Sequence, residues 1–244
     1  MRPLSAQDLL RVWEVGETQH PLDRALTLLA VACPELTWDE LAALSVGQRD
    51  ARLFTIREQA SGPRLNGFAE CPRCAERLEF DVAVADLRVA ADPDEEEEAR
   101  ELVTDGLVLR FRLPNSRDLA ALLGCQDPAV ARSLLVQRCV LHASRDGTAV
   151  AGSELPAKAI SRLAKRMAEC DPQAEVLLGL RCPACDHAWQ ALFDIVTFFW
   201  AELVAQAKRL LCEVHTLARA YGWHEADILG MSTRRRQFYL DMAT

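Results

Sequence analysis

The sequence lacks any uninterrupted apolar run long enough to span a membrane. The nearest candidate, residues 192–204, is broken by Asp194 and Glu202, whereas a membrane-spanning helix needs about 20 predominantly apolar residues. Residues 1–10 also lack the apolar segment of a secretory signal peptide. We therefore expect no membrane association, and we expect the nine cysteines to lie in a reducing compartment, where disulfides are rare.

The sequence also lacks the motifs that most often mark catalytic sites. It contains no phosphate-binding glycine loop, no His-Glu-x-x-His motif and no Gly-x-Ser-x-Gly turn. His20, His142, His215 and His224 have no carboxylate or nucleophile at a telling spacing. We therefore expect a protein that is not an enzyme.

Positive charge is outnumbered by negative charge. There are 28 lysines and arginines against 36 aspartates and glutamates, which gives a net charge of −8. A chain of this charge is repelled by the phosphates of nucleic acids and by anionic membranes, so we expect neither as a general partner. The 50% hydrophobic content is ordinary for a soluble globular protein with one large or two small cores.

Two Cys-Pro-x-Cys motifs stand out, at residues 71–74 and 182–185. Apolar and polar residues alternate on both sides of each motif, which predicts that each motif is the tip of a β-hairpin. A similar tripeptide follows each motif and suggests an internal repeat: Phe80-Asp81-Val82 and Phe193-Asp194-Ile195.

Four thiolates on two such tips are the right number for one tetrahedral zinc ion. We predict a structural Zn²⁺ bound by Cys71, Cys74, Cys182 and Cys185. Two separate redox or unliganded pairs, or disulfides, are the alternatives, and His187 is a competing ligand. We expect the remaining cysteines to be buried apolar residues: Cys33, Cys125, Cys139, Cys170 and Cys212.

The pattern as a whole predicts a mainly α protein with small β content. It contains a split four-cysteine zinc ribbon made of two knuckle hairpins, with a helical insert between the halves and flanking helices at both termini. The expected divisions are N-terminal helices over residues 1–62, a first zinc-knuckle hairpin over 63–88, an acidic linker plus helical insert over 89–173, a second zinc-knuckle hairpin over 174–196, and a long helix with two short helices over 197–244.

Capping signals place several of these helices. Ser5 and Thr37 each precede an acidic residue by three positions, which is the spacing of a capping box, and Pro21 suits a first helical turn. The charged residues of a helix over residues 48–59 are expected to face solvent.

In the insert, we expect one isolated strand over residues 107–113. It is followed by a short helix capped by Ser116 and by a helix that begins at Asp127-Pro128 and carries Leu141. The acidic run over residues 92–98 is either a mobile linker or a docking strip for a basic partner.

The longest regular pattern covers residues 198–221 and carries a broad apolar stripe. This stripe must be buried, either against the N-terminal helices of the same chain or against another chain in a homo- or hetero-oligomer. In the last helix, three arginines lie in the first turn, where the helix dipole disfavours cations. They are either solvated or paired with acidic groups, such as Glu225 and Asp227 or a surface of another protein.

Three segments resemble a known family of baseplate proteins. They are residues 47–53 (Gly-Gln-Arg-Asp-Ala-Arg-Leu), residues 198–203 (Phe-Phe-Trp-Ala-Glu-Leu), and residues 220–229 (Ala-Tyr-Gly-Trp-His-Glu-Ala-Asp-Ile-Leu) with the arginines and tyrosine that follow. That family occurs in contractile-tailed phages and in phage-like contractile injection systems, and it includes hub subunits and hub-assembly factors. The resemblance is to its zinc-bearing members.

The resemblance implies a structural or chaperone-like assembly component of a contractile baseplate. Its partners would be hub or wedge proteins, and it would be found in the bacterial cytoplasm or in an assembled phage-like particle. The residues that it suggests for partner binding are Tyr221, Trp223, Arg234, Arg235, Arg236 and Tyr239. A zinc-ribbon adaptor for nucleic acid or transcription is the alternative function, although only Arg73, Arg77 and Arg181 lie beside the knuckles.

Overall fold

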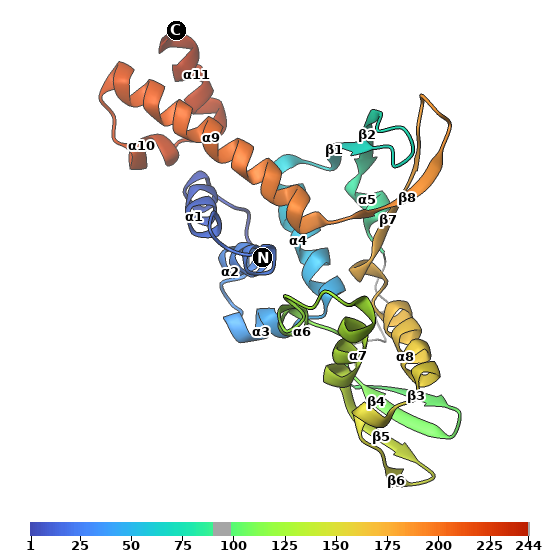
Figure 1. Ribbon diagram of the computed structural model, residues 1–244. Helices are drawn as coiled ribbons and strands as arrows, with labels where there is room; N and C mark the ends of the chain where they lie inside the picture. Colours follow the sequence, from blue (N-terminus) through green and yellow to red (C-terminus); the bar gives the residue numbers. More distant parts are fainter. Residues whose placement is uncertain (90–98, 244) are drawn as a thin grey trace.

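The structure, a computed structural model, describes residues 1–89 and 99–243. Helices and small antiparallel sheets alternate along the chain (Figure 1). The helices are α1 Ala6–Gly16, α2 Pro21–Ala32, α3 Trp38–Ala43, α4 Val46–Ser61, α5 Val84–Leu87, α6 Ser116–Ala120, α7 Pro128–Cys139, α8 Ala157–Cys170, α9 Ile195–Tyr221, α10 Glu225–Leu229 and α11 Thr233–Ala243, with short 3₁₀ turns η2 Gly152–Glu154 and η3 Pro172–Ala174. The strands are β1 Arg64–Glu70, β2 Arg77–Ala83, β3 Arg100–Thr104, β4 Leu107–Phe111, β5 Val140–Arg145, β6 Thr148–Ala149, β7 Val176–Arg181 and β8 Ala188–Phe193.

The N-terminal helices begin where their capping residues predict. Ser5 and Asp8 form a capping box at α1, and Thr37 and Glu40 form one at α3. A third box, in which Ser45 is the cap of α4, was not expected. Such caps satisfy the backbone N–H groups that a helix leaves unpaired at its start.

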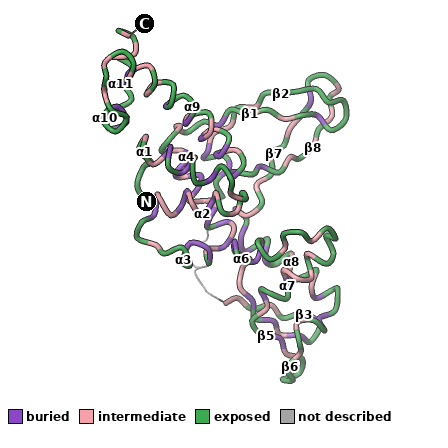
Figure 2. Tube along the Cα trace, turned by 60° about the vertical axis from the view of Figure 1, so that its left-hand side comes forward, coloured by how far each residue is buried: buried purple, intermediate pink, exposed green. Residues whose placement is uncertain are grey.

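The long helix α9 buries its apolar stripe within the chain. Its stripe joins residues of α1, α2, α3 and α4 in one core, so the first of the two alternatives for this helix holds. Figure 2 shows the buried residues concentrated where these helices meet. At Gly16 an added Cβ would lie 2.4 Å from the Trp200 ring, which shows how closely α1 approaches α9. The buried residues of α9 are Ile195, Val196, Phe199, Trp200, Leu203, Ala207, Leu210 and Leu217.

The segment between the hairpins is not the helical insert with one strand that we expected. It holds a four-stranded antiparallel sheet in the order β3-β4-β5-β6, with α7 and α8 packed against it in a second core. Leu141 therefore lies on β5 and not on a helix, and Asn115, not Ser116, caps α6. Of the residues that the structure describes, 55% are helical and 20% lie in strands, so the fold is mixed α/β and the description as mainly α holds only roughly. The acidic run over residues 92–98 falls outside the described residues, and its role as a linker or a docking strip stays a prediction.

The charged residues of α4 do not all face solvent, contrary to expectation. Arg57 is 2% exposed and donates two hydrogen bonds to Glu202 of α9, at 2.8 and 2.7 Å. Arg49 is 4% exposed and pairs with Asp50 at 2.7 Å. Because a buried charge is costly unless it is paired, the Arg57–Glu202 contact fixes α4 against α9, whereas the Arg49–Asp50 pair lies within α4.

The first turn of α4 also joins the two cores. The Gly47 N–H donates to Asp171 Oδ2 at 2.9 Å, and the Val46 N–H donates to the Pro114 carbonyl at 3.0 Å. A Cβ on residue 47 would lie 2.0 Å from Asp171 Oδ1, so only glycine fits without displacing that carboxylate.

We expect Gly47→Ala to lower the free energy of unfolding by about 1–3 kcal/mol, because the new methyl group displaces Asp171 and breaks its hydrogen bond. Urea denaturation followed by circular dichroism measures this. Gly179→Ala is the matched control, since nothing lies within 4 Å of its Cβ position; it should change stability by less than about 0.5 kcal/mol. Equal effects of the two substitutions would contradict the close contact at Gly47.

Among the described residues, no helix has the length and apolar character that crossing a membrane requires.

Candidate metal centre

The two Cys-Pro-x-Cys motifs form the tips of two hairpins, β1-β2 and β7-β8, as the sequence predicts. In the first tip the Cys71 N–H donates to the Glu76 carbonyl at 2.9 Å, and in the second the Cys182 N–H donates to the His187 carbonyl at the same distance. The hydrogen-bonding pattern is therefore the same in both tips.

The residue after the second cysteine has left-handed backbone in both tips. Ala75 has φ 58° and Asp186 has φ 61°. This conformation costs a non-glycine residue about 1 kcal/mol or more and persists only where the surroundings impose it. Here each residue donates its N–H to the carbonyl of the first cysteine of its motif, at 2.9 and 3.0 Å. This turn directs both cysteines of each motif to one side.

The four sulfurs meet although more than a hundred residues separate the two motifs. Cys71 Sγ lies 3.6 Å from Cys185 Sγ, Cys74 Sγ lies 3.5 Å from Cys182 Sγ, and all four lie within 4.8 Å of one another. Sulfurs bound to one tetrahedral ion at about 2.3 Å are separated by about 3.8 Å. The cluster can therefore hold one metal ion.

The backbone around the sulfurs favours ionised thiols in part of the cluster. Burial raises the pKa of the Cys71 thiol, but the N–H groups of Arg73 and Cys74 and the Cys185 sulfur outweigh it and lower this pKa to about 7. The Glu76 N–H acts in the same direction on Cys74, whereas the neighbouring sulfurs raise that pKa to about 12. Four thiolates this close repel one another unless a cation lies between them.

The positions of the sulfur atoms distinguish a shared metal site from separate cysteine pairs, disulfides and a site that includes His187. All nine cysteines are free, and each of the two close sulfur contacts joins one cysteine of each hairpin rather than the two of one motif. His187 stacks its ring on Trp189, with 6.0 Å between ring centroids, and does not belong to the cluster. A shared site is thus better supported than two separate pairs.

The internal repeat is confined to the knuckles. Asp81 lies within β2 and pairs with Arg64, whereas Asp194 is the N-cap of α9. The matching tripeptides therefore occupy different structural positions and do not extend the repeat.

The other five cysteines are only partly as expected. Cys33, Cys139 and Cys170 are buried, Cys125 is partly exposed and Cys212 is exposed, so the expectation of burial is wrong for Cys212. Burial raises the pKa of Cys139 to about 12, which keeps it a neutral core thiol.

The C-terminal residues suggested for partner binding contact one another. Tyr221 stacks on Trp223 at 4.5 Å between centroids, Tyr239 packs edge-on against both, and the Tyr221 hydroxyl donates to the Tyr239 carbonyl at 3.2 Å. Arg235 lies over the Tyr239 ring at 5.7 Å. This packing gives the segment a structural role, and its use in binding stays a prediction.

The acidic partner of the terminal arginines is an unexpected one. Arg236 is 4% exposed and donates to Glu213 of α9 at 3.0 Å, rather than to Glu225 or Asp227. Arg234 remains exposed. One of the three arginines thus holds α11 on α9.

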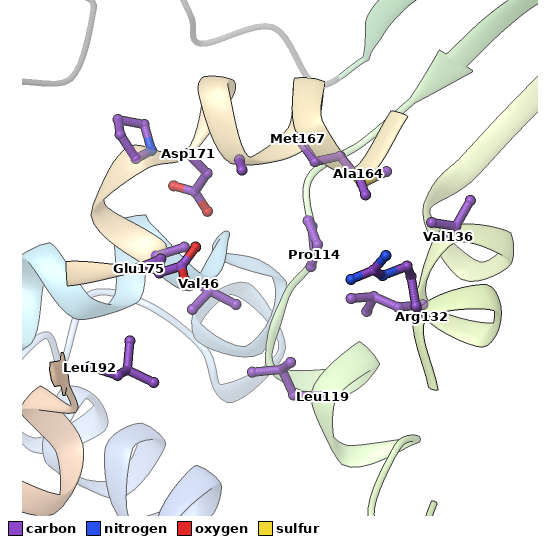
Figure 3. Close-up of a pocket in the computed structure, with 14 residues that line it drawn as sticks. Val46, Pro114, Leu119, Arg132, Val136, Ala164, Met167, Asp171, Glu175 and Leu192 are labelled. Carbon is purple, nitrogen blue, oxygen red and sulfur yellow. The ribbon is translucent and has the colours of Figure 1, made fainter. Parts of the chain in front are cut away.

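A largely apolar groove of about 620 Å³ lies between the insert and the second hairpin (Figure 3). Val46, Met167 and Leu192 contribute apolar walls, and Figure 3 shows the carboxylates of Asp171 and Glu175 on the side opposite Arg132. Its described lining residues include no histidine, serine or cysteine.

Sequence reasoning did not identify the residues that join the two cores. Asp171, the Asn115 cap and Asp118 are buried polar residues, and the partner of Asp171 comes from a distant segment. The one available signal was at Asn115, which precedes Asp118 by three positions and so has the spacing of a capping box.

Comparison with known proteins adds family membership to this geometry. Residues 5–200 match the family model described as T4 bacteriophage base plate protein. The matched range includes both cysteine motifs, residues 47–53 and the start of the segment over residues 198–203; residues 220–229 lie outside it. No curated protein and no solved structure gave a significant match. Because the matched range covers most of the chain, this protein belongs to the T4 bacteriophage base plate protein family.

Proposed function

We propose that the protein is a non-enzymatic structural or assembly component of the baseplate of a phage-tail-like contractile injection system, and that a structural zinc ion holds its scaffold together. Membership of the baseplate family supports the first part and suggests a non-enzymatic role. The convergence of four sulfurs from two distant hairpins is the single observation that carries the second part.

Zinc is the metal that this donor set fits best. Four cysteines on two Cys-x-x-Cys tips give a closed tetrahedral sulfur shell, which is typical of structural zinc sites. Iron–sulfur clusters also use four cysteines, but the shared tip geometry and the separations of 3.5 and 3.6 Å suit a single ion. The proposed ligands are Cys71, Cys74, Cys182 and Cys185.

The ion would act as a brace. Leu65 of the first hairpin and Leu178 of the second contribute to the same core as α4 and α9. Metal–sulfur bonds between the two hairpin tips would close a loop of the chain from residue 74 to residue 182. This closure would limit how the insert can move relative to the helices. The resulting rigid surface would bind hub or wedge subunits of the same particle. An oligomer through α9 would have to use faces other than its buried stripe, such as the region of Leu211, which is 37% exposed.

Co-expression with candidate baseplate proteins encoded beside its gene tests this role. We expect a complex with a hub or wedge protein that survives size-exclusion chromatography and contains no nucleic acid. The tagged protein alone should not retain DNA or RNA at about 0.15 M salt. Salt-sensitive retention of nucleic acid with no baseplate complex would instead support the adaptor function.

A further inference from the structure

A second concave surface, separate from the metal centre and the apolar groove, gathers positive charge in this acidic protein. It has a volume of about 930 Å³ and lies where α3, α4, α6 and the end of α7 meet β3, β4 and β5. Among the residues that the structure describes, its lining contains five arginines and one acidic residue, although the whole chain carries a net charge of −8. We call it the arginine cleft: Arg100, Arg110, Arg112, Arg117 and Arg138, with Asp118.

Two of these arginines are held in place by a buried carboxylate. Asp118 is 0% exposed and accepts from Arg112 Nη2 at 2.9 Å and from Arg138 Nε at 3.0 Å. Arg112 also donates to the Arg138 carbonyl at 3.1 Å. One carboxylate thus neutralises only one of two fixed guanidinium groups, whose side chains remain 30% and 38% exposed.

Two further arginines offer charge at the mouth of the cleft. Arg110 is exposed on β4, and the described residues provide it with no ion-pair partner, Glu101 opposite it on β3 included. Arg117 donates to Asp39 at 2.6 Å, but the Asp39 side chain is 87% exposed and the Arg117 side chain is 50% exposed. An exposed ion pair of this kind contributes little free energy, so a ligand carboxylate can replace Asp39 with little loss of stability.

We propose that the arginine cleft binds an acidic segment of another protein, whose carboxylates pair with Arg110, Arg112, Arg117 and Arg138. Guanidinium groups bind carboxylates in a planar, two-bonded geometry, and fixed guanidinium groups lose little freedom on binding. Leu113 and Leu141 belong to the same lining, and Leu141 is 54% exposed, so the segment carries aliphatic residues beside its acids.

The lining favours a peptide over a nucleic acid. Proteins that bind single-stranded nucleic acid stack bases on aromatic side chains, and the described residues that line the cleft include no aromatic one. A long polyanion would also face repulsion from the rest of the acidic chain. A short acidic peptide can bind within the cleft without approaching the acidic remainder of the surface.

The acidic segment would belong to one partner of this chain, so the inference rests on the proposed role as a subunit that binds other proteins. The test uses the full-length metal-loaded protein and a fluorescein-labelled peptide of repeated Glu-Glu-Leu units, with fluorescence anisotropy as the readout. We expect saturable binding that weakens as salt rises. In the double variant Arg110→Ala with Arg117→Ala, the Kd should rise by about tenfold or more, because two charge-assisted contacts are lost.

The matched control is Arg11→Ala with Arg145→Ala, which removes the same charge from two exposed arginines outside the cleft. Its Kd should stay within about twofold of the wild-type value. Both variants should show the wild-type circular dichroism spectrum, because the substituted side chains are exposed. Three results would each overturn the inference: no saturable binding by the wild type, equal losses in both variants, or tighter binding of a labelled oligodeoxythymidine of matched length. The assay contains no baseplate protein, so its failure leaves the baseplate role standing.

Discussion

Replacing Cys185 by serine is expected to abolish tight metal binding and to lower the free energy of unfolding by about 5 kcal/mol. Loss of one of four sulfur ligands opens the closed shell, and structural zinc contributes its binding energy directly to folding. The expected loss of about 5 kcal/mol follows from the loop that the ion closes between residues 74 and 182. In the chain-entropy account, a cross-link across about 100 residues stabilises the folded state by about 4.7 kcal/mol. Urea denaturation of the purified variant measures the loss.

Cys212→Ser is the matched control for this prediction. Cys212 is an exposed thiol on α9 and lies outside the sulfur cluster, so its substitution should leave both metal content and stability unchanged. A strong chelator added to the wild type should reproduce the loss seen in Cys185→Ser and should have little effect on that variant. If Cys185→Ser retained a full complement of metal and wild-type stability, the proposed ligand set would be wrong.

Replacing Arg57 by alanine is expected to lower the free energy of unfolding by about 3–5 kcal/mol, although the residue lines neither the apolar groove nor the arginine cleft. Arg57 is 2% exposed, donates twice to Glu202 and donates to the Gly62 carbonyl at 2.8 Å. Removing Arg57 leaves two groups without their donor: the Glu202 carboxylate, whose side chain is 25% exposed, and the Gly62 carbonyl. Their loss of a partner accounts for most of the cost. Denaturant unfolding of the variant, followed by tryptophan fluorescence, measures it.

Two further variants separate the effect of burying the Arg57–Glu202 ion pair from the effect of its charge pairing. Arg64 pairs with Asp81 on the surface, with 58% and 50% of the side chains exposed, so Arg64→Ala should cost less than about 1 kcal/mol. The double variant Arg57→Met with Glu202→Met should recover part of the loss, because a well-packed apolar pair can replace a buried ion pair. A cost at Arg57 no larger than that at Arg64 would contradict a buried, structurally required pair.

The sequence predicted those helices and hairpins whose formation depends on residues close together in the chain. Capping boxes at Ser5 and Thr37 and the proline at the start of α2 placed three helices, because each motif suits the unpaired N–H groups of its own first turn. Alternation of apolar residues predicted both hairpins, and the cysteine spacing predicted that their tips share a site.

The errors occur where distant residues decide the outcome. The apolar pattern from residue 128 to Leu141 predicts one helix, yet α7 ends at Cys139 and β5 follows, because Ala143 and Ser144 pair with β4. Pairing between strands that are far apart in sequence leaves a weaker periodic signal than a helix does. The charges of α4 were misjudged for the same reason, since Glu202 lies 145 positions after Arg57.

The family segments identified from sequence acquire physical explanations in the structure. Gly47 permits the contact with Asp171, Arg49 is buried beside Asp50, and Glu202 holds Arg57. Aromatic contacts of residues 221 and 223 pack the chain end. These residues therefore help to maintain the scaffold, and the use of residues 221–239 in partner binding stays a prediction.

X-ray absorption at the zinc edge of the purified protein tests the central claim most directly, since it reports the identity, number and distance of the metal's ligands together. We expect one zinc per chain, with four sulfur neighbours at about 2.3 Å and no nitrogen or oxygen neighbour. Folded protein that contains no zinc, or zinc bound by fewer than four sulfurs, would contradict a structural zinc held by both hairpins.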